Sequence, residues 1–210
     1  MAKPNLFTFA KKIEMQKPAT TITPINSIIS NRWSPRVFSK KPVEPAKINA
    51  ILEAARWSPS AFNEQPWRFI VGKEQDETRK KILDSLIEWN QNWAKIAPLL
   101  VLNIARLSFT HNNEPNEMAE YDLGQAVAAM TLEAVNQQLF SHQMTGFDGR
   151  KAEQLFNIPE GYKAVSVTAF GYYGNPEDIP ADIADMESNE RSRKAIDEIV
   201  FGATFGEPVK

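Results

Sequence analysis

Residues 55–72, ARWSPSAFNEQPWRFIVG, connect a helix-patterned segment to a short apolar run through a loop unusually rich in polar residues. Serine, proline, asparagine, glutamate and glutamine follow closely on one another before Trp67 restores apolar character. A connection between two elements needs only a few turn-forming residues. The surplus of polar groups raises the question of what this loop contacts, and the surrounding chain supplies the context.

The segments on both sides of the loop have clear periodicities. Glu44 and Pro45 open a helix, and WRFIVG (67–72) has the composition of a short buried strand. Residues 76–89 are amphipathic and predict a further helix, and PLLVLNIA (98–105) predicts a strand buried on both faces. The apolar positions of the two helices are Ile48, Ile51, Leu52 and Ala55 in the first, and Ile82, Leu83, Leu86 and Ile87 in the second.

The rest of the chain also alternates between helix and strand patterns. The pattern from 116 to 140 predicts a long helix whose second half is apolar almost all round, which is typical of a central buried helix. The remaining expected segments are a short helix (24–33), a polar connector (111–121), a loop (141–150), a short helix (151–156) and a strand (163–174). Because the elements do not follow a strict βαβ repeat, the class is α+β, or α/β with a mixed sheet.

The composition excludes several classes of function. The chain has 210 residues, 42% hydrophobic and 24% charged, with a formal net charge of −2 and no cysteine. These values are ordinary for a soluble one-domain protein and give no general attraction to nucleic acid or to an anionic membrane. Disulfides, thiolate nucleophiles and cysteine-ligated metals are excluded. Without a transmembrane run or an apolar signal core, we expect a cytoplasmic protein.

Common catalytic motifs are also absent from the sequence. There is no Rossmann glycine fingerprint, no P-loop, no H-E-x-x-H and no G-x-S-x-G. A hydrolytic triad would have to use one of the only two histidines, His111 and His142, and the favoured pair is His142 with Ser60. The sequence predicts no metal site, because the acidic residues near 120 are better explained as first-turn residues of a helix.

Two basic segments have the composition of an anion site. In NRWSPRVF (31–38), Arg32 and Arg36 bracket Ser34 on a proline-stiffened turn, and such guanidinium groups match the oxygens of a phosphate. The alternative is a helix C-terminus that carries favourable positive charge. RSRK (191–194) is either a solvated basic turn or a distant second half of the same site.

The loop itself has two interpretations. Asn63 and Gln65 stand two positions apart, so in an extended segment they point the same way. Their amides would suit a heteroaromatic ring that offers both carbonyl and N–H groups. Alternatively, the amides satisfy the backbone of their own loop.

Taken together, these segments resemble the nitroreductase family of FMN-dependent oxidoreductases. The family opens with a pattern like R-x-S-x-R-x-F, found here from Arg32 to Phe38. A pattern like A-P-S-A-x-N-x-Q-P-W follows, matched by SPSAFNEQPW except for Ser58 at its first position. A glycine loop after the long helix (HQMTGFD) and a basic pair before an apolar stretch (RSRKAIDEIVFGATFGEP) complete the resemblance. The match leaves residues 1–25 as an N-terminal arm and makes 26–210 a single FMN-binding domain.

The resemblance implies which residues hold the cofactor. They are Arg32, Trp33, Ser34, Arg36, Pro59, Ser60, Asn63, Gln65, Thr145, Gly146, Arg191 and Arg193. The arginines and Ser34 would hold the FMN phosphate and ribityl chain, with Trp33 standing where many members have a second basic residue. The loop residues would line the isoalloxazine ring of the second subunit's site, and Thr145 and Gly146 would present backbone N–H groups to the flavin. One of Asn90, Asn92 and Lys95 would contact the flavin as well.

The resemblance also implies a fold and a reaction. The fold is α+β, with a mixed, largely antiparallel central sheet flanked by helices, in an intertwined homodimer. The reaction is ping-pong hydride transfer from NADH or NADPH through FMN to a small-molecule acceptor such as a nitro-compound, a quinone or an activated alkene. Because the cofactor carries the chemistry, no side chain is expected to be catalytic. The alternative is a flavin-binding relative without reductase turnover that cleaves or sequesters flavin.

Overall fold

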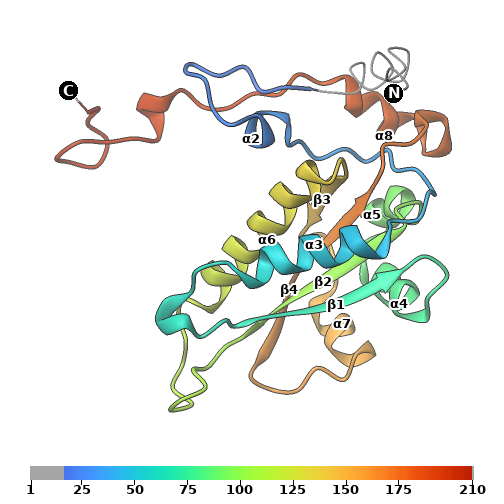
Figure 1. The fold of residues 1–210 in the computed structure, drawn as a ribbon, viewed down its shortest axis with the longest axis horizontal. Helices are drawn as coiled ribbons and strands as arrows, with labels where there is room; N and C mark the ends of the chain where they lie inside the picture. The colour runs from blue at the N-terminus through green and yellow to red at the C-terminus, as the bar shows by residue number, and fades with distance from the viewer. Residues whose placement is uncertain (1–16, 210) are drawn as a thin grey trace, which may run out of the picture.

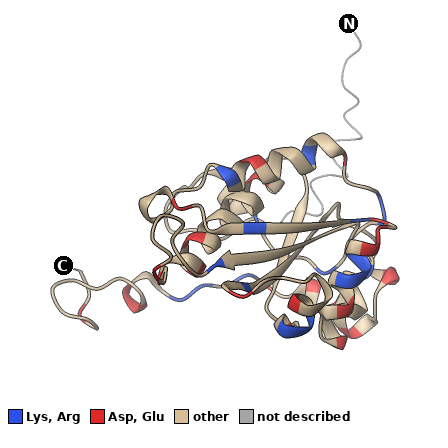
Figure 2. Ribbon diagram, turned by 90° about the horizontal axis from the view of Figure 1, so that it is seen from below, with Lys and Arg blue, Asp and Glu red and all other residues tan. Residues whose placement is uncertain are grey.

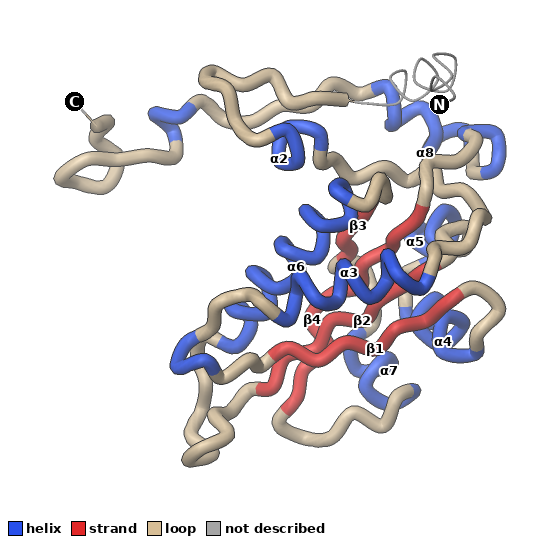
Figure 3. Tube along the Cα trace, viewed as in Figure 1, coloured by secondary structure: helices blue, strands red, loops and turns tan. Residues whose placement is uncertain are grey.

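The computed structural model describes residues 17–209 and places a four-stranded sheet between two layers of helices (Figure 1 and Figure 3). The strands are β1 (Trp67–Lys73), β2 (Leu99–Arg106), β3 (Phe140–Met144) and β4 (Tyr162–Gly171). Their order in the sheet is β1-β2-β4-β3, and each neighbouring pair is antiparallel. The predicted α+β class with a largely antiparallel central sheet is confirmed.

Helices cover both faces of this sheet. The α-helices are α2 (Ser27–Asn31), α3 (Pro45–Arg56), α4 (Glu77–Ser85), α5 (Glu88–Ala94), α6 (Ala119–Asn136), α7 (Gly149–Leu155) and α8 (Ala181–Asp185). Short 3-10 turns are η1 (Ala61–Asn63), η2 (Pro176–Asp178), η3 (Met186–Ser188) and η4 (Ile196–Glu198). Helices α3 and α6 pack on one face, whereas α4, α5 and α7 pack on the other.

The central strand β2 joins the two apolar cores. Its side chains alternate, so that Leu99 and Val101 face α3 and α6 while Leu100 and Leu102 face the opposite layer. The strand is buried along almost its whole length, as its continuous apolar run predicted. Strand β1 is less buried than predicted, because it forms an edge of the sheet in this chain.

Helix α3 forms where the sequence predicted it. Pro45 stands at the first helical position, where its missing N–H would have no partner. Ile48, Ile51 and Ala55 are buried against α6 and the sheet. The helix ends at Arg56, directly before the polar loop, and so fixes the point from which that loop departs.

The prediction of a single amphipathic helix over 76–89 is wrong, because the helix is interrupted after Ser85. The helix stops at Ser85, Leu86 and Ile87 are extended, and α5 then begins at Glu88. Leu86 forms a β-bridge with Phe147, and the Ile87 N–H donates to the carbonyl oxygen of Gly146 at 3.1 Å. This pairing with a distant segment prevails over the local helical period, which contains no information about it.

The boundary after α6 also differs from the prediction. The helix ends at Asn136 instead of continuing to Phe140, and strand β3 is formed by Phe140 together with residues 141–144 of the expected loop. Gln138 adopts a positive φ of 61°, which reverses the chain after the helix. The strand pairs with β4, so its extended form depends on a partner that lies later in the sequence. The true loop is therefore only residues 145–148, around Gly146.

Segments from both ends of the described chain lie side by side beyond the sheet (Figure 1). Residues 17–38 run along the C-terminal segment that carries α8 and η3 (Figure 1). After η3, the chain passes α2 and extends away from the sheet. Within residues 17–209, no helix is long and apolar enough to cross a membrane. Acidic and basic residues are interspersed along the helices (Figure 2).

Candidate functional site

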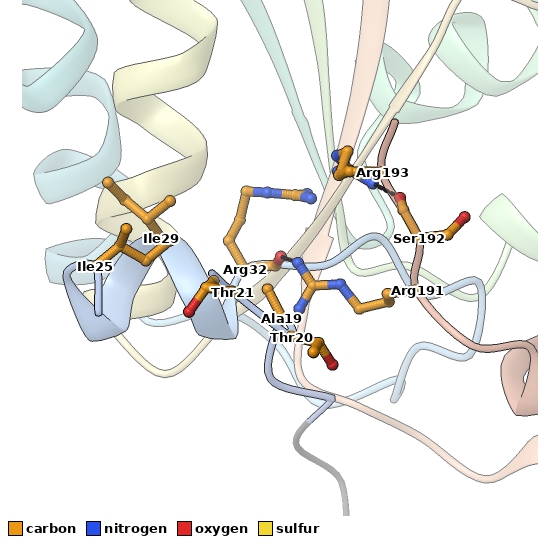
Figure 4. Close-up of a pocket in the computed structure, with 9 residues that line it drawn as sticks. All are labelled: Ala19, Thr20, Thr21, Ile25, Ile29, Arg32, Arg191, Ser192 and Arg193. Carbon is orange, nitrogen blue, oxygen red and sulfur yellow. Dashed lines mark hydrogen bonds between the residues drawn. The ribbon is translucent and has the colours of Figure 1, made fainter. Parts of the chain in front are cut away.

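An arginine-rich cavity lies where the two ends of the described chain meet (Figure 4). Its volume is about 250 Å³. The residues that line it are Ala19, Thr20, Thr21, Ile25, Ile29, Arg32, Arg191, Ser192 and Arg193. Three of the arginines that the sequence assigned to one anion site are thus brought together from positions far apart in the chain.

The local sequence explains the position of Arg32. Asn26 caps α2 by accepting a hydrogen bond from the N–H of Ile28 at 2.9 Å, and the helix ends at Asn31. Arg32 follows as the C-cap in an extended conformation, and its N–H donates to the carbonyl oxygen of Ile28 at 3.2 Å. Its Nη1 donates to the hydroxyl oxygen of Ser34 at 3.1 Å, so the first two polar residues of the R-x-S-x-R pattern form one unit.

The electrostatics of the cavity favour an anion. Burial lowers the pKa of Arg32, and the positive charges of Arg191 and Arg193 lower it further. No acidic residue lines the cavity, and none of the ion pairs in the described chain involves these three arginines. Clustered guanidinium groups without a carboxylate are stabilised when a phosphate or another anion binds between them.

Arg191 and Arg193 differ in what they contact. Arg191 donates to main-chain carbonyl oxygens of Lys17, Ser30 and Arg32, the last at 2.8 Å. In the described part of the chain, the Arg193 guanidinium makes one hydrogen bond, from Nη1 to the neighbouring carbonyl oxygen of Ser192 at 2.7 Å.

Trp33 and Arg36 lie on the inner side of this segment. The Trp33 ring is 8% exposed and contacts Phe140 edge-on at 5.9 Å between ring centroids, while its indole Nε1 is buried without a hydrogen-bond partner. The Arg36 guanidinium lies 5.0 Å from the Trp89 ring, and its Nε is also buried without a partner. Burial lowers the pKa of Arg36, against the opposing effect of the Glu187 carboxylate.

The glycine loop after β3 is built around a buried amide. Asn90 of α5 is 6% exposed, and its Nδ2 donates to the carbonyl oxygen of Gly146 at 2.9 Å. A Cβ on Gly146 would lie 2.7 Å from this Nδ2 and 2.9 Å from Cδ1 of Ile87. Glycine is therefore needed at this position because the chain passes too close to α5 for a side chain. Among the candidates Asn90, Asn92 and Lys95, the structure places Asn90 against the loop.

Replacement of Asn90 by alanine is expected to lower the free energy of unfolding by about 1–2 kcal/mol, because the partly buried Gly146 carbonyl loses its side-chain donor. Urea unfolding of the variant checks this value. Asn92→Ala, two positions along the same helix, is the matched control, and an equal loss in both variants would contradict the assignment of Asn90.

The polar loop is held by side chains from two other segments. The N–H of Ala61 donates to Oδ2 of Asp122 on α6 at 3.0 Å, and Oε1 of Glu64 accepts from the N–H of Thr110 at 2.9 Å and from its hydroxyl. The hydrogen bonds to Thr110 lower the pKa of Glu64 against the opposing effect of desolvation, which is its largest single influence. Neither Asp122 nor Thr110 was predicted to support the loop, since nothing in the local sequence connects them to it.

The loop also stores backbone strain. Phe62, Asn63 and Gln65 all have positive φ angles, between 52° and 57°. Such angles are unusual for residues other than glycine, and several in one short loop indicate a functional constraint. The Ser60 hydroxyl oxygen accepts from the N–H of Gln65 at 3.0 Å, and the Gln65 amide donates to the carbonyl of Asn63 at 2.9 Å. These bonds fit the interpretation in which the loop satisfies its own backbone.

The structure brings some predicted residues together and leaves others apart. Arg32, Ser34, Arg191 and Arg193 form one group, Gly146 with Asn90 a second, and the polar loop a third. Within residues 17–209, no recorded hydrogen bond or ion pair joins the three groups. Ser60 and His142 also make separate contacts, since His142 donates from Nδ1 to the carbonyl oxygen of Pro35 at 3.0 Å. A hydrolytic pair of these two residues therefore does not form in this chain.

Comparisons with known proteins identify the family. Residues 29–99 match the family model described as "Nitroreductase family". A solved structure described as an oxidoreductase containing FMN superposes with a TM-score of 0.84 at 30% identity, covering 89% of this chain and 95% of that one. The chain belongs to the nitroreductase family. Its R-x-S-x-R segment and its polar loop both fall inside the matched range, while Gly146 and the second basic pair lie beyond it.

Two further relatives are similar to this chain in sequence. An uncharacterised 15.4 kDa protein of Mycolicibacterium smegmatis is 30% identical over 152 residues, covering 68% of this chain and 99% of the relative. The major NAD(P)H-flavin oxidoreductase of Aliivibrio fischeri is 25% identical over 221 residues, covering 84% of this chain and 97% of the relative.

Proposed function

We propose that this protein is an FMN-dependent oxidoreductase that transfers electrons from NADH or NADPH to a small acceptor such as a nitro-compound, a quinone or an activated alkene. The observation that carries the proposal is the arginine cavity, whose unopposed positive charge fits a phosphate. The FMN in a solved relative at 30% identity supports this ligand. When bound, FMN supplies the hydride chemistry.

The residues of the chain bind and orient this cofactor. Arg32 and Arg193 hold the phosphate by charge-assisted hydrogen bonds, with Ser34 fixing the direction of the Arg32 side chain. Gly146 lets its loop pass close to Ile87 and Asn90, and Asn90 fixes the backbone whose N–H groups would face the flavin. Because FMN carries the redox chemistry, we assign no acid, base or nucleophile.

A homodimer unites the three groups of residues. The polar loop, with Pro59, Ser60, Asn63 and Gln65, completes the site of the second subunit, because no hydrogen bond or ion pair among residues 17–209 joins it to the arginine cavity of its own chain. The outer face of α6 supports this arrangement, since Tyr121 is 62% exposed and Gly124 has nothing in contact with its Cβ position. The C-terminal residues Ile196, Ile199 and Phe205 are at least 59% exposed, which fits apolar groups that pack on another subunit.

Anaerobic titration tests the proposal. The purified protein is expected to be yellow, or to become so with added FMN, and the flavin absorbance is expected to bleach with NADH or NADPH and return with an acceptor. A protein that takes up no FMN contradicts the proposal. Bound FMN that no nicotinamide bleaches indicates the alternative, a flavin-binding relative without reductase turnover.

A further inference from the structure

The contacts of Arg191 set it apart from the other two arginines of the cavity. Its Nη1 donates to the carbonyl oxygens of Lys17 and of Ser30, the second at 2.7 Å, and its Nη2 donates to that of Arg32. One guanidinium group therefore joins the C-terminal segment to two separate stretches of the N-terminal segment. Figure 4 shows its bond to the carbonyl oxygen of Arg32. Within residues 17–209, by contrast, the guanidinium groups of Arg32 and Arg193 each make one hydrogen bond, to a residue one or two positions away in the sequence.

These contacts fix the main chain on which Arg32 stands. The carbonyl of Arg32 is held directly by Arg191, and the carbonyl of Ser30, two residues earlier, is held by both Arg191 and the N–H of Ala19 at 2.8 Å. The direction in which the Arg32 side chain enters the cavity thus depends on the position of Arg191.

The same contacts fasten residues 17–21 across the cavity. Ala19, Thr20 and Thr21 line it on the side opposite Arg193. The segment is held at its beginning by Arg191, which binds the carbonyl of Lys17, and by the Lys17 ammonium, which donates to the carbonyl of Asn189 at 3.2 Å. This segment precedes the range that matches the nitroreductase family.

We propose that Arg191 is a positioning residue, which orients Arg32 and fastens residues 17–21 over the cavity, while Arg32 and Arg193 bind the phosphate. The proposal rests on the proposed function, since it takes the FMN phosphate as the ligand. The two basic residues of one motif thus have different roles: Arg191 holds the main chain in place, and Arg193 binds the phosphate directly.

Lysine substitutions separate these two roles. A guanidinium group presents its donors as a planar fork that reaches several carbonyls at once, whereas an ammonium group is a compact point charge. Arg191→Lys therefore keeps the charge and loses the fork, and Arg193→Lys is the matched control two residues away. A direct contact with a phosphate depends mainly on charge. An arginine-to-lysine substitution therefore weakens such a contact less than it weakens the hydrogen bonds of Arg191 to several carbonyl groups.

Equilibrium binding of FMN and of riboflavin, which lacks the phosphate, tests the proposal. We expect Arg191→Lys to weaken FMN binding by about tenfold and Arg193→Lys by about threefold or less, with riboflavin binding changed by less than about twofold in both. A general structural defect would weaken the binding of FMN and of riboflavin equally. The ratio of the two affinities therefore distinguishes a positioning role from general damage to the fold. Hydrogen exchange at the Ala19 amide is expected to accelerate in Arg191→Lys and to stay unchanged in Arg193→Lys.

A double variant supplies the decisive comparison. If Arg191 acts through Arg32, adding Arg191→Lys to Arg32→Gln is expected to produce little further loss of FMN binding. The inference is overturned if the double variant loses the product of the two single losses of FMN affinity. It is also overturned if Arg191→Lys binds FMN as well as Arg193→Lys does. Both outcomes leave the proposed function intact. A wild-type protein that binds riboflavin and FMN equally overturns the phosphate assignment, and one that binds neither overturns both. Should Arg191→Lys fail to fold, Arg191→Gln, which keeps a donor for one carbonyl, is expected to give the same selective loss.

Discussion

Arg32→Gln is expected to weaken FMN binding by about a hundredfold and to leave riboflavin binding nearly unchanged. Arg32 is half-buried, and burial together with two neighbouring arginines lowers the pKa of its guanidinium group. A phosphate relieves this repulsion and replaces lost hydration with charge-assisted hydrogen bonds, which contribute about 1.5–3 kcal/mol each. Glutamine retains a donor but not the charge, so the loss falls on the ligand that carries the phosphate.

Fluorescence quenching of both flavins measures this effect. Lys80→Gln, an equal loss of charge at an exposed position on α4, is the matched control and is expected to bind FMN like the wild type. The affinity of the wild type is also expected to fall with salt, and that of Arg32→Gln to fall less steeply. Equal loss of FMN and riboflavin binding in Arg32→Gln would show that Arg32 supports the fold and does not bind the phosphate.

Acid is expected to destabilise the protein through His142. Burial lowers the pKa of this imidazole to about 4 from an ordinary value of 6.5, and the charges of Arg36 and Arg32 act in the same direction. The hydrogen bond that Nδ1 donates to the Pro35 carbonyl opposes the shift, and the ring lies 4.6 Å from that of Trp93. The folded protein therefore favours the neutral imidazole more strongly than the unfolded chain does.

The sign follows from this difference. Because the folded pKa is the lower one, the unfolded chain takes up a proton first as the pH falls, and the stability present above pH 6.5 is lost between about pH 6.5 and pH 4. A shift of this size corresponds to about 3 kcal/mol in the free energy of unfolding between pH 7 and pH 4.

Urea unfolding at pH 7, 5.5 and 4, with protein and FMN concentrations held constant, measures the loss. His142→Asn keeps a donor for the Pro35 carbonyl without a titrating ring, so its stability is expected to fall less over this range. His111→Asn removes the other histidine of the chain and is the matched control. An identical pH dependence in His142→Asn and the wild type would exclude His142 as the source.

Elements stabilised by local chemistry were predictable from the sequence. Helix α3 begins at a proline and carries its apolar residues at helical spacing, and β2 is a continuous apolar run, so both were correctly placed. The break between α4 and α5 was not predictable, since it depends on the bond between Ile87 and Gly146. Strand β3 was missed for the same reason, because its extended form depends on pairing with β4.

The candidate site shows the same division. Motif spacing selected the arginines that line one cavity, and it marked Gly146, where a side chain would collide with α5. It did not show that Arg191 donates hydrogen bonds to main-chain carbonyls. Every residue has such a carbonyl, so the sequence does not indicate which of them accept a bond. It also did not connect Glu64 with Thr110, which lie far apart in the sequence and meet only when the chain folds.

The position of the arginine cavity has a consequence for biosynthesis. One wall consists of residues 19–32 and the other of residues 191–193, so the cavity encloses its ligand only after nearly the whole described chain has left the ribosome. The sheet and both helical layers are complete by then, because β4 ends at Gly171. Under the proposed function, the site for the FMN phosphate is therefore complete only when the segment around Arg191 has packed onto residues 19–32.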